Sequence, residues 1–195
     1  MADEPRIVSL GAYGPKMNFF VLKGWVEELI DSLGAAKPRF EAEKENPSYH
    51  PGRCAKVFAG DTLIGVFGQI HPLVCRNYGV DADFYCAELG LSELMQAKGA
   101  DPVYTPLPKF PAVSRDIAVV CDRKIPVAEL SKCIMGAGGK FLKACTLFDI
   151  YTGERVAGDK KSVAFSLTMR ADDQTLTDEH AEETISAVLN ALEHK

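Results

Sequence analysis

The chain has 195 residues, of which 22 are basic and 27 acidic, giving a formal net charge of −5, and 47% are hydrophobic. This composition is ordinary for a globular protein that buries a core, and the length allows one large domain or two small ones. Neither half of the chain has the positive charge of a general DNA- or RNA-coating protein: residues 1–105 hold 10 basic and 14 acidic residues, and residues 106–195 hold 12 and 13. No apolar run approaches the ~20 residues of a membrane helix.

The beginning of the chain predicts a loop followed by a helix. The opening MADEPRIVSLGAYG has an irregular composition and no signal-peptide pattern, which favours a loop or a segment cut out of a longer chain. A helix is expected over 18–34, ended by Gly34. Its apolar residues form a wide stripe that we expect to be core: Phe20, Leu22, Trp25, Val26, Leu29, Ile30 and Leu33.

A β-hairpin is predicted over 54–72, because two β-rich runs are joined across Gly60 and Asp61. A short helix, a strand and a last short helix are expected after it, over 72–80, 83–91 and 92–99. These elements are too few to close a sheet of their own. The first half therefore reads as part of an α+β domain.

The stretch DPVYTPLPKFPAV (101–113) is the expected domain boundary. Its four prolines forbid helix and favour extended chain: Pro102, Pro106, Pro108 and Pro111. We therefore expect one domain over 1–105 and a second over 106–195.

The second half predicts the order β-α-β-β-α. A strand is expected over 114–121, a helix over 126–139, a hairpin over 147–170 and a helix over 177–195, with Thr177 as its N-cap. This order is the split βαβ, or ferredoxin-like, plan, so the fold class is α+β. A fourth strand should follow the last helix, and its lack indicates that the sequence is a piece of a longer protein.

In this plan both helices cover one face of the sheet, and the other face stays open. Alternation along the strands assigns each side chain to a face. The inward set is Ile117, Val119, Cys121, Phe148, Ile150, Val163, Phe165, Leu167 and Met169. The outward set is Asp116, Ala118, Val120, Asp149, Tyr151, Ser162, Ala164, Ser166 and Thr168.

The outward set suits a flat ligand. Small side chains let such a ligand lie close to the backbone, and Tyr151 offers a ring for stacking. Asp149 beside it could accept hydrogen bonds from guanine N1–H and N2–H. A solvated sheet face with an incidental tyrosine, or a contact with another protein, explains the same pattern. Ferredoxin-like domains often bind small ligands or dimerise through this face.

Other chemistry-bearing residues predict neither a metal site nor catalysis. The six cysteines form no C-x-x-C pair and read as buried thiols of a reducing compartment: Cys54, Cys75, Cys86, Cys121, Cys133 and Cys145. His50 and His71 both precede proline and have no further ligands at metal-binding spacing. No nucleophile is paired with a base, so we expect no catalytic residue in this chain.

Several long motifs resemble one known family. KFPAVSRDIAVV, LFDIYTGERVAGDKKSVAFSLTMR and QTLTDEHAEETI resemble the C-terminal anticodon-binding domain of the bacterial-type phenylalanyl-tRNA synthetase β subunit. Upstream, NFFVLKGWVEELI, HPGRCAKVFAGDTLIGVFGQIHP and FYCAELGLSEL resemble the end of the catalytic-like domain of that subunit. The resemblance covers almost the whole chain after its first fifteen residues.

The resemblance implies a cytoplasmic α2β2 class II synthetase that joins phenylalanine to its tRNA with ATP and magnesium. It places the active site in the α subunit, so no cofactor is expected here and this chain alone should not be an enzyme. Arg53 is the only candidate for an ATP-binding motif, and we favour a structural role for it.

The resemblance also implies which residues contact the first anticodon base, a guanine: Ala118, Asp149, Tyr151 and Ser162. Tyr151 would stack on the base, Asp149 would take its edge, Ser162 would offer a hydroxyl and Ala118 a close approach to the backbone. Arg115, Lys160 and Lys161 are candidates for phosphate contacts, and for each a solvated surface charge is an equal alternative.

Overall fold

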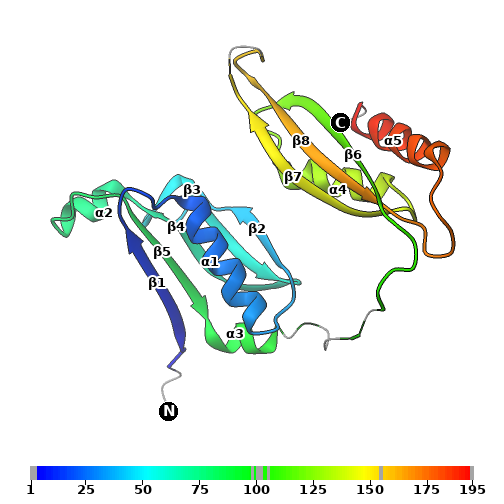
Figure 1. Cartoon of the computed structure of the whole chain (residues 1–195). Helices are drawn as coiled ribbons and strands as arrows, with labels where there is room; N and C mark the ends of the chain where they lie inside the picture. The colour runs from blue at the N-terminus through cyan, green and yellow to red at the C-terminus, as the bar shows by residue number, and fades with distance from the viewer. Residues whose placement is uncertain (1–3, 98, 100–102, 105, 154–155, 194–195) are drawn as a thin grey trace. The chain divides into compact units, whose positions relative to one another are not determined.

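The computed structural model describes residues 4–97, 99, 103–104, 106–153 and 156–193. It consists of two compact units, Met1–Tyr104 and Thr105–Lys195 (Figure 1). The division lies one residue before the expected one, within the proline-spaced segment. Of the four prolines in that segment, Pro102 lies outside the described residues. No helix in the described part of the chain is long and apolar enough to cross a membrane.

The first unit is a five-stranded antiparallel sheet with helices. Its elements are β1 (Ile7–Tyr13), α1 (Phe19–Ser32), β2 (Pro38–Ala42), β3 (Tyr49–Ala59), β4 (Thr62–Ile70), α2 (Pro72–Asn77), β5 (Phe84–Gly90) and α3 (Leu91–Gln96). The strand order is β1-β5-β4-β3-β2. The hairpin of β3 and β4 and the three helices agree with the sequence patterns.

Two strands of this unit were not expected. The loop predicted for the first residues is wrong there, because β1 pairs with β5 from Ile7 opposite Gly90 to Tyr13 opposite Phe84. The second unpredicted strand, β2, pairs with β3. Both lie at the sheet edges, where pairing with a partner distant in sequence outweighs weak local preference. The unit therefore does form a sheet of its own, contrary to the expectation.

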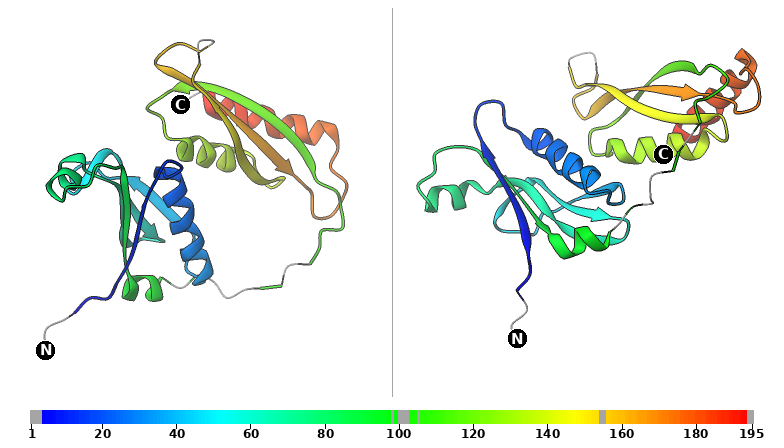
Figure 2. Two further views of the ribbon diagram at one scale, coloured as in Figure 1. Left: turned by 60° about the vertical axis from the view of Figure 1, so that its left-hand side comes forward. Right: turned by 60° about the horizontal axis from the view of Figure 1, so that its bottom comes forward.

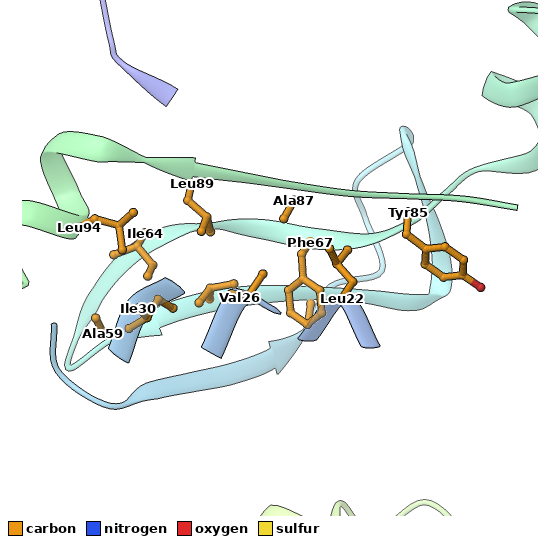
Figure 3. Packing of buried hydrophobic residues seen from close by; sticks show 12 residues of the cluster. Leu22, Val26, Ile30, Ala59, Ile64, Phe67, Tyr85, Ala87, Leu89 and Leu94 are labelled. Atoms are coloured by element: carbon orange, nitrogen blue, oxygen red, sulfur yellow. The ribbon is translucent and has the colours of Figure 1, made fainter. Parts of the chain in front are cut away.

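The core of the first unit lies between α1 and the sheet. Leu22, Val26 and Ile30 are fully buried, and Figure 3 shows them packed toward sheet residues such as Phe67 and Leu89. The predicted stripe is too wide: the exposed fractions are 76% for Phe20, 44% for Trp25 and 52% for Leu33. The sheet contacts one line of residues spaced four apart, and side chains off that line stay in contact with solvent.

The second unit has the ferredoxin-like order β-α-β-β-α. Its elements are β6 (Val113–Asp122), α4 (Val127–Ala137), β7 (Leu142–Tyr151), β8 (Lys160–Met169) and α5 (Asp178–Glu193). The antiparallel strands lie in the order β6-β8-β7. Both helices lie on the same face of this sheet (Figures 1 and 2). The fourth strand of the plan is not among the described residues.

The core of the second unit follows the predicted alternation along β8. Val163, Phe165, Leu167 and Met169 are fully buried toward the helices, while the residues between them are partly exposed. Leu130, Ile134 and Val188 of the helices complete this core, with Ile117 from β6. The alternation predicted for β6 and β8 is thus confirmed, and the opposite face of the sheet carries no described helix.

Candidate nucleic-acid interface

Side chains on the open face of the second sheet are arranged in rows, because directly opposite residues of antiparallel strands point to the same side. The last row that spans all three strands, the end row, consists of Val120, Ser162 and Tyr151. The next row, the inner row, consists of Ala118, Ala164 and Asp149. The four predicted anticodon-binding residues therefore lie together in two neighbouring rows. Side chains in such rows are about 7 Å apart along a strand.

A β-bulge in β7 determines which of its side chains reach this face. Leu147 lies opposite Phe165, but the next pair is Asp149 and Ala164, so Phe148 is an extra residue without a partner. If Phe148 paired regularly with Ala164, Asp149 would lie opposite Val163 and face the helices. The bulge therefore brings Asp149 and Tyr151 to the open face.

The same bulge corrects the prediction for Phe148. We expected this side chain in the core, but 57% of it is exposed. Ile150 lies opposite buried Val163 and so has the predicted orientation, yet it remains 44% exposed. Strand β7 is at the edge of the sheet, and the helices leave its end uncovered. Alternation gives the face of a side chain but not whether anything covers it.

Tyr151 borders an open hollow of about 540 Å³ at the end of the face. The hollow is lined by the three residues of the end row and by Val156 from the β7–β8 connection. Its volume is within the ~300–1,000 Å³ that ligand sites span. Val156 was missed by the sequence analysis, although a large apolar residue in the otherwise small and polar turn TGERVAGDK was a usable signal. An apolar wall and a half-exposed ring suit a planar, aromatic ligand.

Two of the three cations predicted near phosphates lie on the helix side. Arg115 is opposite Leu167, and its Nη2 donates to Oδ1 of Asp178 at 2.9 Å. Lys161 donates through Nζ to the carbonyl oxygen of Ile125 at 2.5 Å. Arg115 is two residues before Ile117 and Lys161 two residues before Val163, so alternation along each strand already indicated the helix side. Both side chains are therefore engaged away from the predicted base-binding residues.

Lys160 is exposed and shares the parity of Ser162, so it belongs to the open face, opposite Asp122. Arg123, which the sequence analysis missed, lies beside it. Its Nη2 donates to the carbonyl oxygen of Thr152 and its Nε to that of Lys160, both at 3.2 Å. Arg123 thus joins both ends of the connection that carries Val156.

The charge on the open face suits a base more than a phosphate. Among the described residues paired in this sheet, Asp116, Asp122 and Asp149 lie on this face by register, against one cation, Lys160. Carboxylates accept hydrogen bonds and repel phosphate, so the inner part of the face favours N–H donors of a base edge. In the described part of this unit, Lys160 carries a positive charge at the rim of the face, and Arg123 lies next to it.

The polar groups of the first unit are engaged in structural contacts. Arg53 Nη1 donates to Gln69 Oε1 at 2.5 Å, and Gln69 Nε2 donates to Asp83 Oδ1 at 2.8 Å. Nδ1 of His50 and Nδ1 of His71 each accept from a backbone N–H two residues ahead. Among the described residues, no three His, Cys, Asp or Glu side chains gather to hold a metal ion.

Several ionisable groups of that unit have shifted pKa values, among them Glu43 and Cys54. A hydrogen bond from Lys56, whose Nζ is 2.6 Å from Oε2, lowers the pKa of the Glu43 carboxyl. Burial raises the pKa of the Cys54 thiol to about 11, which keeps it neutral at physiological pH. The first shift thus comes from an ion pair and the second from burial.

Comparisons with known proteins assign each unit. Residues 108–195 match the ferredoxin-fold anticodon binding domain, and residues 1–91 match the phenylalanyl tRNA synthetase beta chain CLM domain. A phenylalanine–tRNA ligase beta subunit of Clostridium acetobutylicum is 41% identical over 191 residues, which is 98% of this chain and 24% of the relative. One from Bacillus subtilis is 43% identical over 177 residues, 91% of this chain and 22% of the relative.

The chain thus spans about a quarter of the length of these curated relatives. The two family matches lie in the two units and follow each other in the order that the sequence motifs indicated. A second match to the anticodon-binding domain, or the reverse order of the two matches, would have indicated a different family. The chain belongs to the family of phenylalanyl-tRNA synthetase beta subunits, and its second unit is a ferredoxin-fold anticodon-binding domain.

Proposed function

We propose that the second unit binds the anticodon of phenylalanine tRNA through the end row and the inner row of its open face. The single observation that carries this proposal is the bulge-dependent grouping of Tyr151, Ser162, Asp149 and Ala118 in two neighbouring rows beside the hollow. The anticodon-binding match over 108–195 supports this function over a protein-contact or small-ligand module.

Tyr151 provides the stacking surface in this proposal. Tyr151 is 42% exposed, and Val120 and Val156 extend the apolar wall beside its ring. Stacking of one base on such a ring contributes about 1–3 kcal/mol. Ser162, between Tyr151 and Val120 in the end row, offers a hydroxyl at the floor of the hollow.

Asp149 reads the base in this proposal. Its carboxylate can accept from both N1–H and N2–H of a guanine, a pair of donors that the other bases do not present together. Ala118 and Ala164 complete the inner row, and their small side chains let the base approach the sheet closely. Discrimination at the first anticodon position would therefore depend on Asp149, and affinity on Tyr151.

Phosphate contacts would come from the rim. Lys160 is exposed beside the hollow and can reach a backbone phosphate while the base lies on the sheet. Arg115 and Lys161 could contribute only after leaving Asp178 and the carbonyl oxygen of Ile125. We therefore expect Lys160 to be the principal phosphate contact of the three.

The remaining assignments follow from the family. We infer that the first unit is the end of a class II-like domain without catalytic residues, and that the beta subunit works with an alpha subunit in a cytoplasmic α2β2 assembly. The alpha subunit would join phenylalanine to the tRNA with ATP and Mg²⁺. In the first unit, Arg53 is bonded to Gln69, which supports a structural role for this arginine.

The test is binding of the 195-residue chain to phenylalanine tRNA and to the same tRNA with its first anticodon base changed. We expect tighter binding to the unchanged tRNA, because only a guanine offers the donor pair for Asp149. Equal binding of the two tRNAs, or no binding of either, would contradict the proposal.

A further inference from the structure

Gly153 lies two residues after Tyr151, and the tyrosine ring occupies the space that a side chain at 153 would need. A Cβ built on Gly153 would be 2.2 Å from Oη, 2.4 Å from Cζ and 2.9 Å from Cε2 of Tyr151. Such distances are below any normal carbon contact, for which about 3.5–4.0 Å is optimal. The outer end of the ring therefore rests directly on the glycine backbone.

The backbone of Gly153 does not itself require glycine. The glycines with positive φ are Gly14, Gly34, Gly60, Gly79 and Gly139, so Gly153 has a φ that other residues adopt. Its carbonyl oxygen accepts from the N–H of Val156 at 3.1 Å, which closes a turn that any residue could make. The absence of a side chain at 153 matters only for the ring of Tyr151.

We propose that Gly153 is a positioning residue for Tyr151: by leaving room for the phenol ring, it lets the ring lie against the β7–β8 connection with its other side facing the hollow. The inference rests on the proposed function, in which that ring stacks on a base. A tyrosine has two side-chain torsions, and a ring that is already held loses less rotational freedom when a base stacks on it.

The connection that supports the ring is itself held at both ends. Arg123 donates to the carbonyl oxygens of Thr152 and Lys160, and its own N–H donates to the carbonyl oxygen of Asp159 at 2.9 Å. Gly153 follows Thr152 directly, so its position is tied to strand β6 through Arg123. Because this backbone is anchored, it cannot easily shift to make room for a new Cβ at residue 153, and the ring of Tyr151 would have to move instead.

The experiment compares Gly153→Ala with a matched control, Gly158→Ala, in the 195-residue chain. Gly158 lies in the same connection, has no heavy atom within 4 Å of a built Cβ and has no positive φ. We expect Gly153→Ala to weaken binding to phenylalanine tRNA by about 3- to 10-fold, part of a lost stack, and Gly158→Ala to leave it unchanged. In a Tyr151→Ala background, Gly153→Ala should have no further effect, because no ring remains to be displaced.

A second readout needs no RNA. In NMR spectra of the free chain, the Tyr151 ring resonances should shift in Gly153→Ala and stay in place in Gly158→Ala. Unmoved ring resonances, or wild-type binding by Gly153→Ala while Tyr151→Ala binds weakly, would overturn the positioning role and leave the proposed function standing. Wild-type binding by Tyr151→Ala would instead refute the proposed function, and the ring resonances would then decide the role of Gly153 alone.

Discussion

Replacing Tyr151 by alanine tests the proposed interface most directly. Tyr151 is 42% exposed, so the exposed part of its ring is available to a base, whereas the part that lies against Gly153 already contacts the chain. Loss of one base stack costs about 1–3 kcal/mol, which corresponds to a roughly 5- to 150-fold weaker Kd. Because the chain already covers more than half of Tyr151, we expect the lower half of this range, about 1–2 kcal/mol.

The assay is a fluorescence-anisotropy titration of labelled phenylalanine tRNA with the wild-type chain, Tyr151→Ala and Tyr151→Phe. Phenylalanine keeps the ring and should bind nearly as well as tyrosine, since stacking uses the ring face and not the hydroxyl. Thermal melts should show a small loss of stability for Tyr151→Ala, unlike replacement of a fully buried ring such as Phe165, which typically costs about 3–5 kcal/mol. Unchanged tRNA binding by Tyr151→Ala, or an equal loss in Tyr151→Phe, would refute the stacking argument.

Four further predictions concern specificity, phosphate contact, pH and catalysis. Asp149→Ala should lower the preference for a guanine at the first anticodon position, since a base-edge contact carries sequence information; unchanged discrimination in competition binding would contradict it. Lys160→Ala should weaken all tRNAs alike and reduce the slope of log K against log salt by about one, which a salt titration measures. Lys56 lowers the pKa of Glu43 in the folded chain. The contribution of the Glu43–Lys56 pair to folding stability should therefore be fully present above the unfolded Glu pKa of about 4.3, and it should be lost as pH falls through the folded pKa. Thermal melts of wild type and Glu43→Gln from pH 7 to 3 should accordingly give melting temperatures that converge in acid. The chain alone should show no phenylalanine-dependent ATP–pyrophosphate exchange, and activity in a sample free of host synthetase would contradict its assignment as non-catalytic.

The local sequence pattern was sufficient to assign side chains to the two faces of a strand where helices of the same unit cover one face. Alternation along β8 assigned Val163 and Phe165 to the core and Ser162 to the open face, because a buried strand that slips by one residue would expose its whole apolar set. The same parity rule indicates that Arg115 and Lys161 point to the helices. The residue types therefore determined the ferredoxin-like plan and most of the candidate interface.

Pairing between segments that are distant in the sequence decided two features that local pattern did not predict. Strand β1 exists through its ladder with β5, and the extra residue Phe148 is defined only by how β7 pairs with β8. Periodicity within one segment contains no information about its partner, so neither feature could be read from the sequence.

The edges of the interface also depend on tertiary structure. Val156 lines the hollow, Arg123 donates to carbonyl oxygens at the two ends of the connection, and the ring of Tyr151 lies against Gly153. Alternation in the sequence predicted a tyrosine and a carboxylate on an open, small-residue sheet face, and the bulge at Phe148 is what places them there. Only the tertiary structure decided how that tyrosine is held, because contacts across a loop depend on the path of the backbone and not on the order of residue types.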